Sequence, residues 1–211
     1  MSEETPHQCQ LYLITPPRLA RDSFPDLLAE LLDAVPVAAV RLELETTDEE
    51  VITNAADALR GICHARDVPL MITDHYRVVR RLGLDGVHLK GTRHVRDARQ
   101  ELNDTANIGT FCGTSRHAGM SAGEAGADYI SFGPAQASDL GSQEKIELTD
   151  LEWWNEMIEL PSVVEGGLTL DLAKDLASVA DFIALGPEIW NTETTPLKAL
   201  RAYEHVISLN T

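Results

Sequence analysis

Short apolar segments rich in β-branched residues recur along the chain, and amphipathic segments separate them. Successive apolar segments lie roughly 20 to 25 residues apart, which is typical of strands that alternate with helices. Several of them are apolar at every position, as strands buried on both faces of a parallel sheet are. We therefore expect strands at residues 10–16, 38–44, 69–74, 86–90, 107–112, 129–134, 162–167 and 182–187.

The segments between these strands carry helix signals. Thr47 and Glu50 have the spacing of a capping box, which predicts a helix start at this point. Thr195 followed by Pro196 predicts the start of the last helix. The predicted inward faces are Leu27, Leu28, Leu31 and Leu32 in the first helix, Val51, Ile52, Ala55, Leu59 and Ile62 in the second, and Leu197, Leu200, Tyr203 and Ile207 in the last.

Eight strands that alternate with about eight helices predict an α/β protein with a single (β/α)8 TIM barrel spanning residues 1–211. A doubly wound open sheet is the alternative, but no G-x-G-x-x-G follows the first strand. In a (β/α)8 barrel the chemistry lies at the carboxyl ends of the strands. The residues directly after each predicted strand are therefore the candidates for a functional site.

The formal net charge of −17 argues against nucleic acid as a partner, because the overall field repels a phosphate backbone. No apolar run approaches the roughly 20 residues that a membrane span needs, and the polar, acidic first ten residues do not resemble a secretory signal. We expect a cytoplasmic protein. Its three cysteines, Cys9, Cys63 and Cys112, have no C-x-x-C spacing, so we interpret them as buried small side chains.

Two of the predicted strands end in glycine. VVEGGL places Gly166 and Gly167 just before a helix, and FIALGP places Gly186 at the end of the last strand. Bare backbone lets main-chain N–H groups converge on an anion, and phosphate in (β/α)8 barrels is commonly bound after strands seven and eight. These glycines therefore predict a site for a small phosphorylated ligand, with tight turns as the alternative reading.

Several motifs, in order along the chain, resemble those of the thiamine phosphate synthase family, which includes thiazole tautomerases. The resemblance extends over nearly the whole chain. It rests on LYLIT at 11–15, VPLMITD at 68–74, DGVHL at 85–89, GEAGADYISFGP at 123–134, VVEGGLT at 163–169 and FIALGPEIW at 182–190.

The resemblance implies a reaction in which an aminopyrimidine diphosphate and a thiazole phosphate form thiamine phosphate and release pyrophosphate. It implies Mg²⁺ as cofactor with Asp74 as a metal ligand, Lys145 and Arg41 as cations for pyrophosphate, and a homodimer. Gly166, Gly167 and Gly186 would hold the thiazole phosphate. Tautomerase activity is the weaker expectation, because Pro134 stands where those relatives carry a histidine.

The chain also departs from the family pattern. The second strand of the family ends Gln-Leu-Arg-x-Lys, whereas residues 41–45 read Arg-Leu-Glu-Leu-Glu, so Glu43 and Glu45 bring negative charge to this rim. Arg93 stands where the family has a second metal-binding aspartate. The loop after strand six, 135–148, is lengthened and leaves Lys145 as the remnant of a pyrophosphate motif. Ser115, with His117 nearby, lies at the end of strand five.

Two interpretations of these exchanged charges remain open. In the first, Glu43 or Glu45 pairs with Arg93 across the barrel mouth and fills the pyrophosphate space. In the second, one of the two glutamates replaces the lost metal ligand, and pyrophosphate is bound in new positions by Arg41, Lys90, Arg93 and Lys145. The first favours a paralogue that binds a small phosphorylated ligand with impaired catalysis, and the second favours an active transferase. His88, inside a strand, is interpreted as a packed, hydrogen-bonded histidine rather than an acid or base.

Overall fold

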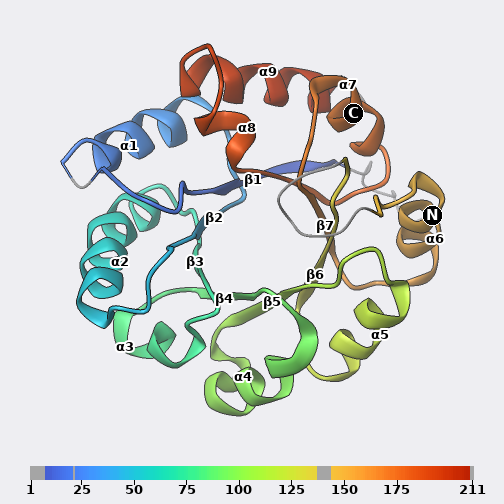
Figure 1. Ribbon diagram of the computed structural model, residues 1–211, viewed down its shortest axis with the longest axis horizontal. Helices are drawn as coiled ribbons and strands as arrows, with labels where there is room; N and C mark the ends of the chain where they lie inside the picture. Colours follow the sequence, from blue (N-terminus) through green and yellow to red (C-terminus); the bar gives the residue numbers. More distant parts are fainter. Residues whose placement is uncertain (1–7, 21, 137–143, 210–211) are drawn as a thin grey trace, which may run out of the picture.

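The computed structural model describes residues 8–20, 22–136 and 144–209. They form a closed parallel barrel in which every strand pairs with its sequence neighbours and the last strand pairs with the first (Figure 1). The predicted (β/α)8 barrel is therefore confirmed. The strands are β1 (Gln10–Ile14), β2 (Ala39–Leu42), β3 (Leu70–Thr73), β4 (Gly86–Leu89), β5 (Asn107–Phe111), β6 (Tyr129–Phe132), β7 (Ser162–Glu165) and β8 (Phe182–Leu185).

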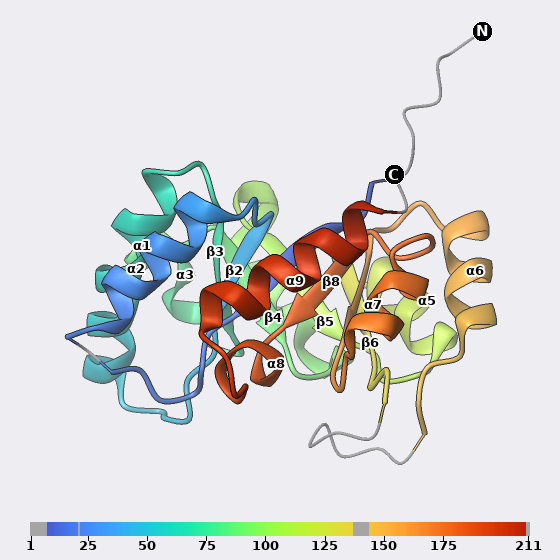
Figure 2. The same cartoon turned by 90° about the horizontal axis from the view of Figure 1, so that it is seen from above.

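A ring of helices covers the outside of the barrel (Figure 1). The α-helices are α1 (Phe24–Ala34), α2 (Glu49–His64), α3 (Val79–Leu82), α4 (Val95–Leu102), α5 (Arg116–Glu124), α6 (Leu148–Met157), α7 (Leu170–Leu176), α8 (Pro187–Trp190) and α9 (Pro196–Ser208). Short 3₁₀ turns are η1 (Tyr76–Val78), η2 (Thr92–His94) and η3 (Asn103–Thr105). Seen from the side, α8 lies at the rim to which β8 leads (Figure 2).

The helix starts follow side-chain capping. Thr195 caps α9 by accepting from the Lys198 N–H, as predicted. The predicted capping box of α2 is wrong by one residue, because Asp48, not Thr47, is the N-cap and accepts from the N–H groups of Glu50 and Val51. A carboxylate at this position also benefits from the positive end of the helix dipole.

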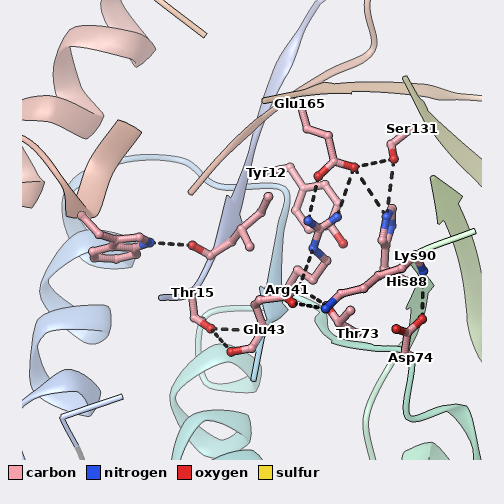
Figure 3. Close-up of polar contacts among 12 residues, drawn as sticks. Tyr12, Thr15, Arg41, Glu43, Thr73, Asp74, His88, Lys90, Ser131 and Glu165 are labelled. Atoms are coloured by element: carbon pink, nitrogen blue, oxygen red, sulfur yellow. Dashed lines mark hydrogen bonds and ion pairs between the residues drawn. The ribbon is translucent and has the colours of Figure 1, made fainter. Parts of the chain in front are cut away.

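Alternation along the strands sorts side chains into two layers. Leu11 and Leu13 of β1 belong to the large apolar cluster shared with the helices, whereas Tyr12 and Ile14 belong to a small cluster inside the barrel. The inner layer also holds buried polar side chains, among them Arg41, His88, Ser131 and Glu165 (Figure 3). The barrel interior is therefore the part of the core that combines apolar and charged groups.

The three cysteines are free and buried, as predicted. Burial raises the pKa of each thiol to about 12, so none is a thiolate nucleophile near neutral pH. None of the helices in the described ranges has the length and apolar character that crossing a membrane requires.

Candidate active site

A cavity of about 890 Å³ opens at the carboxyl ends of the strands. Its size suits a small-molecule site, and its position is the one at which (β/α)8 barrels carry their chemistry. All eight predicted strands end slightly earlier than expected, so the residues after them form loops around this mouth. The predicted site residues that line the cavity are Arg41, Glu43, Gly166, Gly167 and Gly186.

A buried ion pair joins Arg41 of β2 to Glu165 of β7 (Figure 3). Arg41 Nη2 lies 2.7 Å from Glu165 Oε2, and Nη1 lies 3.4 Å from Oε1, so the guanidinium engages both carboxylate oxygens. Burial by itself would raise the pKa of Glu165, but the Arg41 charge together with the hydrogen bonds from Arg41 and Ser131 lowers that pKa to about 2. Burial opposes the Arg41 charge too, yet Glu165 raises the pKa of Arg41 above its ordinary value. Each charge is therefore maintained by its partner.

Arg41 Nε has a different environment. It lies 3.9 Å from Glu43 Oε2, beyond hydrogen-bond distance, and within the described part of the chain it has no hydrogen-bond partner. The Arg41 side chain is only 7% exposed. A buried donor without a partner beside a cavity is a group that a ligand or water can satisfy.

Four more polar side chains continue the network across the barrel interior, and Figure 3 shows three of them, Ser131, His88 and Tyr12. Ser131 Oγ donates to Glu165 Oε1 at 2.5 Å, and His88 Nε2 lies 3.4 Å from Ser131 Oγ. His88 Nδ1 lies 3.1 Å from the Tyr129 hydroxyl, which lies 2.9 Å from the Tyr12 hydroxyl. Burial lowers the pKa of His88 to about 3, so the ring is neutral at pH 7. The interpretation of His88 as a packed, hydrogen-bonded residue is confirmed.

Glu43 lies at the mouth of the cavity, and its side chain contacts Thr73 at the end of β3 and Lys90 directly after β4. Lys90 Nζ lies 2.7 Å from Glu43 Oε1, and Thr73 Oγ1 donates to Glu43 Oε2 at 2.6 Å. The Glu43 N–H donates to Thr15 Oγ1 at 3.0 Å, which fixes the backbone after β2. The Glu43 side chain is 19% exposed, so this contact is partly screened by water.

The predicted ion pair between Arg93 and Glu43 or Glu45 is wrong. A carboxylate after β2 does meet a cation after β4, but the pair is Glu43 with Lys90. Glu45 instead pairs with Arg18 at 3.0 Å on the surface, beside a separate cavity of about 320 Å³. Residues two apart on an extended segment point to the same side only while the strand continues, and β2 ends at Leu42. Beyond that residue the alternation no longer predicts orientation.

Asp74 is exposed, and its Oδ1 accepts from the Lys90 N–H at 2.8 Å. Asp74, Lys90 and the exposed Arg93 line a small cavity of about 410 Å³ beside the mouth. Across residues 8–20, 22–136 and 144–209, no three His, Cys, Asp or Glu side chains are grouped so that they could hold a metal ion. Mg²⁺, however, is commonly held by one or two carboxylates together with substrate phosphates, so Asp74 fits as the protein's share of such a site.

The glycine-rich ends of β7 and β8 lie side by side, and their amides converge. Gly166 and Gly167 have φ angles of 89° and 73°, which are accessible to glycine and strained for other residues. Glu188 Oε1 accepts from the N–H groups of Gly167 at 3.0 Å and Leu168 at 3.1 Å, and Oε2 accepts from the Gly186 N–H at 3.0 Å. The amides thus surround a negatively charged group, which in this structure is a side chain of the same protein.

The remaining predicted residues lie away from the cavity walls. Ser115 is the N-cap of α5 and accepts from the Ala118 N–H, which gives it a structural role. His117 is exposed on α5. Lys145 is exposed and is not among the described residues that line the cavity. Residues 137–143 of the predicted pyrophosphate loop, 135–148, lie outside the described residues.

Glu165 and Glu188 were given no role of their own from the sequence, beyond their places at the ends of strands seven and eight. An acidic residue between an apolar strand and Gly-Gly is a signal in itself, and Glu188 follows the last strand-end glycine by two residues. Lys90, at the end of the strand that contains His88, was among the cations that one interpretation of the sequence expected to bind pyrophosphate, and it lines the cavity. All three lie at strand ends, where the barrel architecture places function.

Comparison with known proteins gives a consistent result. A family model described as thiamine monophosphate synthase matches residues 11–199. The thiamine-phosphate synthase of Rhodospirillum centenum is 39% identical over 204 residues, which cover 94% of this chain and 98% of that protein. The thiamine-phosphate synthase of Erythrobacter litoralis is 38% identical, with 89% of this chain and 91% of that protein covered.

Solved structures support the fold. The thiamine phosphate pyrophosphorylase of Pyrococcus furiosus superimposes with a TM-score of 0.82, covering 97% of this chain and 98% of that chain. Its sequence identity of 23% is low, so this likeness shows the fold alone.

Proposed function

The chain belongs to the thiamine monophosphate synthase family, and on that basis we propose that it acts in thiamine biosynthesis as a thiamine-phosphate synthase. It is a transferase that joins an aminopyrimidine diphosphate to a thiazole phosphate and releases pyrophosphate. The observation that carries this conclusion is the 39% identity with a thiamine-phosphate synthase over nearly the full length of both chains.

The reaction needs charge stabilisation more than proton transfer. The C–O bond to pyrophosphate breaks, its electron pair leaves with pyrophosphate, and the thiazole nitrogen forms the new bond to the pyrimidine carbon. Preorganised cations and amides lower the barrier by stabilising the charge on the leaving group. His88 takes no part as an acid, because with a pKa of about 3 it is neutral at pH 7.

The thiazole phosphate is assigned to the amides at the ends of β7 and β8. Gly166, Gly167 and Gly186 line the cavity, and the amides of Gly167 and Gly186 already bind an anionic group. Several converging N–H groups hold a phosphate without any positive side chain. This arrangement suits a protein whose net charge is strongly negative.

The diphosphate is assigned to the opposite side of the mouth, where Arg41 and Lys90 line the cavity and Asp74 lies next to Lys90. Arg41 Nε is a buried donor that the diphosphate can satisfy. Mg²⁺, when bound, supplies positive charge to the leaving pyrophosphate, and Asp74 is the residue that would hold it. Lys145 is assigned to pyrophosphate by family resemblance.

A second candidate function is binding of a small phosphorylated ligand without turnover. It is favoured by the observation that Arg41 and Lys90 already hold the carboxylates of Glu165 and Glu43. Carboxylates beside an anionic substrate oppose its binding, by a few kcal/mol where the surroundings exclude water. The two candidates therefore differ in whether the diphosphate is accepted.

The test combines turnover with binding. Purified protein, Mg²⁺ and both substrates should yield thiamine phosphate and pyrophosphate in equal amounts, and omission of either substrate should abolish both products. Calorimetry with each substrate alone then separates the candidates: tight binding of the thiazole phosphate without binding of the diphosphate, and no turnover, would establish the second candidate. The homodimer and the cytoplasmic location expected from the sequence stay predictions.

A further inference from the structure

The carboxylate of Glu188 occupies the position in which the amides of the two glycine-rich ends converge. It accepts from the N–H groups of Gly167 and Leu168 with one oxygen and from the N–H of Gly186 with the other. The three distances, 3.0, 3.1 and 3.0 Å, are those of well-formed hydrogen bonds. One side chain therefore satisfies donors from both loops, as a phosphate would.

Local structure explains why Glu188 reaches this point. Pro187 starts the short helix α8 directly after Gly186, and Glu188 is the next residue. The side chain folds back onto the Gly186 N–H two residues before it, and its second oxygen spans the gap to the end of β7. A residue one methylene shorter cannot bridge the same two loops from the same backbone position.

The other anion-binding groups of the cavity show the same pattern. Glu165 engages the guanidinium of Arg41, and Glu43 engages the ammonium of Lys90. The charged side chains that line the cavity among the described residues are thus two cations and three carboxylates, including Glu188. Within the described part of the chain, an incoming phosphate therefore meets no unpaired cation at this wall and has to compete for the amides.

We propose that Glu188 is a specificity-determining residue that competes with the phosphate of the thiazole substrate for the amides of Gly167, Leu168 and Gly186. The apparent affinity for phosphate equals the intrinsic affinity multiplied by the fraction of molecules in which Glu188 has left the amides. A thiazole that carries a free hydroxyl binds with Glu188 in place, because the carboxylate accepts a hydrogen bond from the hydroxyl. The inference rests on the proposed function only for the identity of this substrate.

Calorimetry with inorganic phosphate tests the competition directly. Glu188→Ala should bind phosphate about tenfold or more tightly than the wild-type protein, because the amides become free. Glu188→Asp keeps the charge but shortens the side chain, so it should also bind more tightly. Glu193→Ala, which removes the same charge from an exposed position, is the control and should match the wild type.

Two results would overturn the proposal. Equal phosphate affinity in the wild type and Glu188→Ala would show that the carboxylate does not compete for the amides. A wild-type affinity in Glu188→Asp would show that the negative charge weakens phosphate binding without hydrogen bonds to the amides. If Glu188→Ala does not fold, Glu188→Gln keeps the size with a single acceptor oxygen and should still tighten phosphate binding about threefold or more. An unchanged affinity in Glu188→Gln then counts against the proposal.

The same variants reveal the specificity. In Glu188→Ala the ratio of the affinities for thiazole phosphate and thiazole alcohol should rise by at least the factor by which the affinity for phosphate rises, because the alcohol also loses its acceptor. Phosphate binding needs no turnover, so the outcomes are separable. If the wild-type protein forms no thiamine phosphate but Glu188→Ala binds phosphate more tightly, only the proposed function is rejected. If the wild type forms thiamine phosphate and Glu188→Ala binds phosphate no more tightly, only this inference is rejected.

Discussion

Arg41 and Glu165 form an ion pair inside the barrel although they come from β2 and β7, which are not neighbours in the sheet. The Nη2 to Oε2 distance is 2.7 Å, and the side chains are 7% and 3% exposed. The pair connects opposite walls of the barrel and lies beneath the cavity that the substrates are proposed to enter. It therefore affects both the stability and the charge of the site.

Removal of one partner should destabilise the protein. Glu165→Ala leaves the Arg41 charge buried without its hydrogen-bonded partner and with only the Glu43 carboxylate 3.9 Å away. The loss should cost about 3 kcal/mol in the free energy of unfolding. Urea denaturation measures this loss. Glu45→Ala, which breaks the exposed pair with Arg18, is the matched control and should cost less than about 1 kcal/mol. A loss in Glu165→Ala no larger than in this control would contradict the structural role of the buried pair.

Acid should destabilise the protein through His88. The pKa of His88 is about 3 in the folded protein and 6.5 in its ordinary state, so the unfolded chain binds one more proton between these values. The free energy of unfolding therefore falls as pH falls, by up to about 1.4 kcal/mol per pH unit. The pKa of Glu165 is also lowered, from 4.5 to about 2, which acts in the same direction at lower pH.

The effects of the two groups can be separated between pH 5 and 6.5. Of the two, only His88 differs there in proton binding between the folded and the unfolded protein. Denaturation curves across this interval should show a shallower pH dependence in His88→Gln than in the wild type. His205→Gln, at an exposed position on α9, should keep the wild-type slope. The same slope in all three proteins would show that His88 is not held neutral by burial.

Glu43 should weaken diphosphate binding, because it neutralises Lys90 at the mouth. Glu43→Gln removes this charge and should tighten the binding of the aminopyrimidine diphosphate by about tenfold, as expected for one partly screened charge near an anion. Glu45→Gln is the control, since Glu45 pairs with Arg18 outside the cavity and should change the affinity little. Calorimetry decides the matter, and equal effects of the two substitutions would show that only net charge counts.

Asp74 should determine the response to Mg²⁺. In Asp74→Asn, the affinity for the diphosphate measured with Mg²⁺ should fall by about tenfold or more, whereas the affinity measured with a chelator should change little. The exposed Asp104, next to the start of β5, provides the control as Asp104→Asn. A Mg²⁺ dependence that survives in Asp74→Asn would place the metal elsewhere.

The amino-acid pattern was sufficient to predict the architecture. Strand positions and the inward faces of α1, α2 and α9 follow from periodicity, because burial of an apolar face constrains each element locally. The cap at Thr195 is equally local, since donor and acceptor are three residues apart. The error at Thr47 is of the same kind, as a neighbouring Asp48 competes for the same N–H groups.

The partners of the charged residues were decided by the tertiary structure. Arg41 meets Glu165 at a separation of 124 residues, which no local pattern encodes, because closure of the barrel determines which inward positions face one another. Glu43 and Glu45 have the same residue type and the spacing of one strand face, yet only Glu43 lines the main cavity, since the strand ends before both. The sequence alone thus determined that glycine amides and charged side chains gather at the mouth. The closed barrel decided that Glu188 contacts the amides, Glu165 pairs with Arg41 and Glu43 pairs with Lys90.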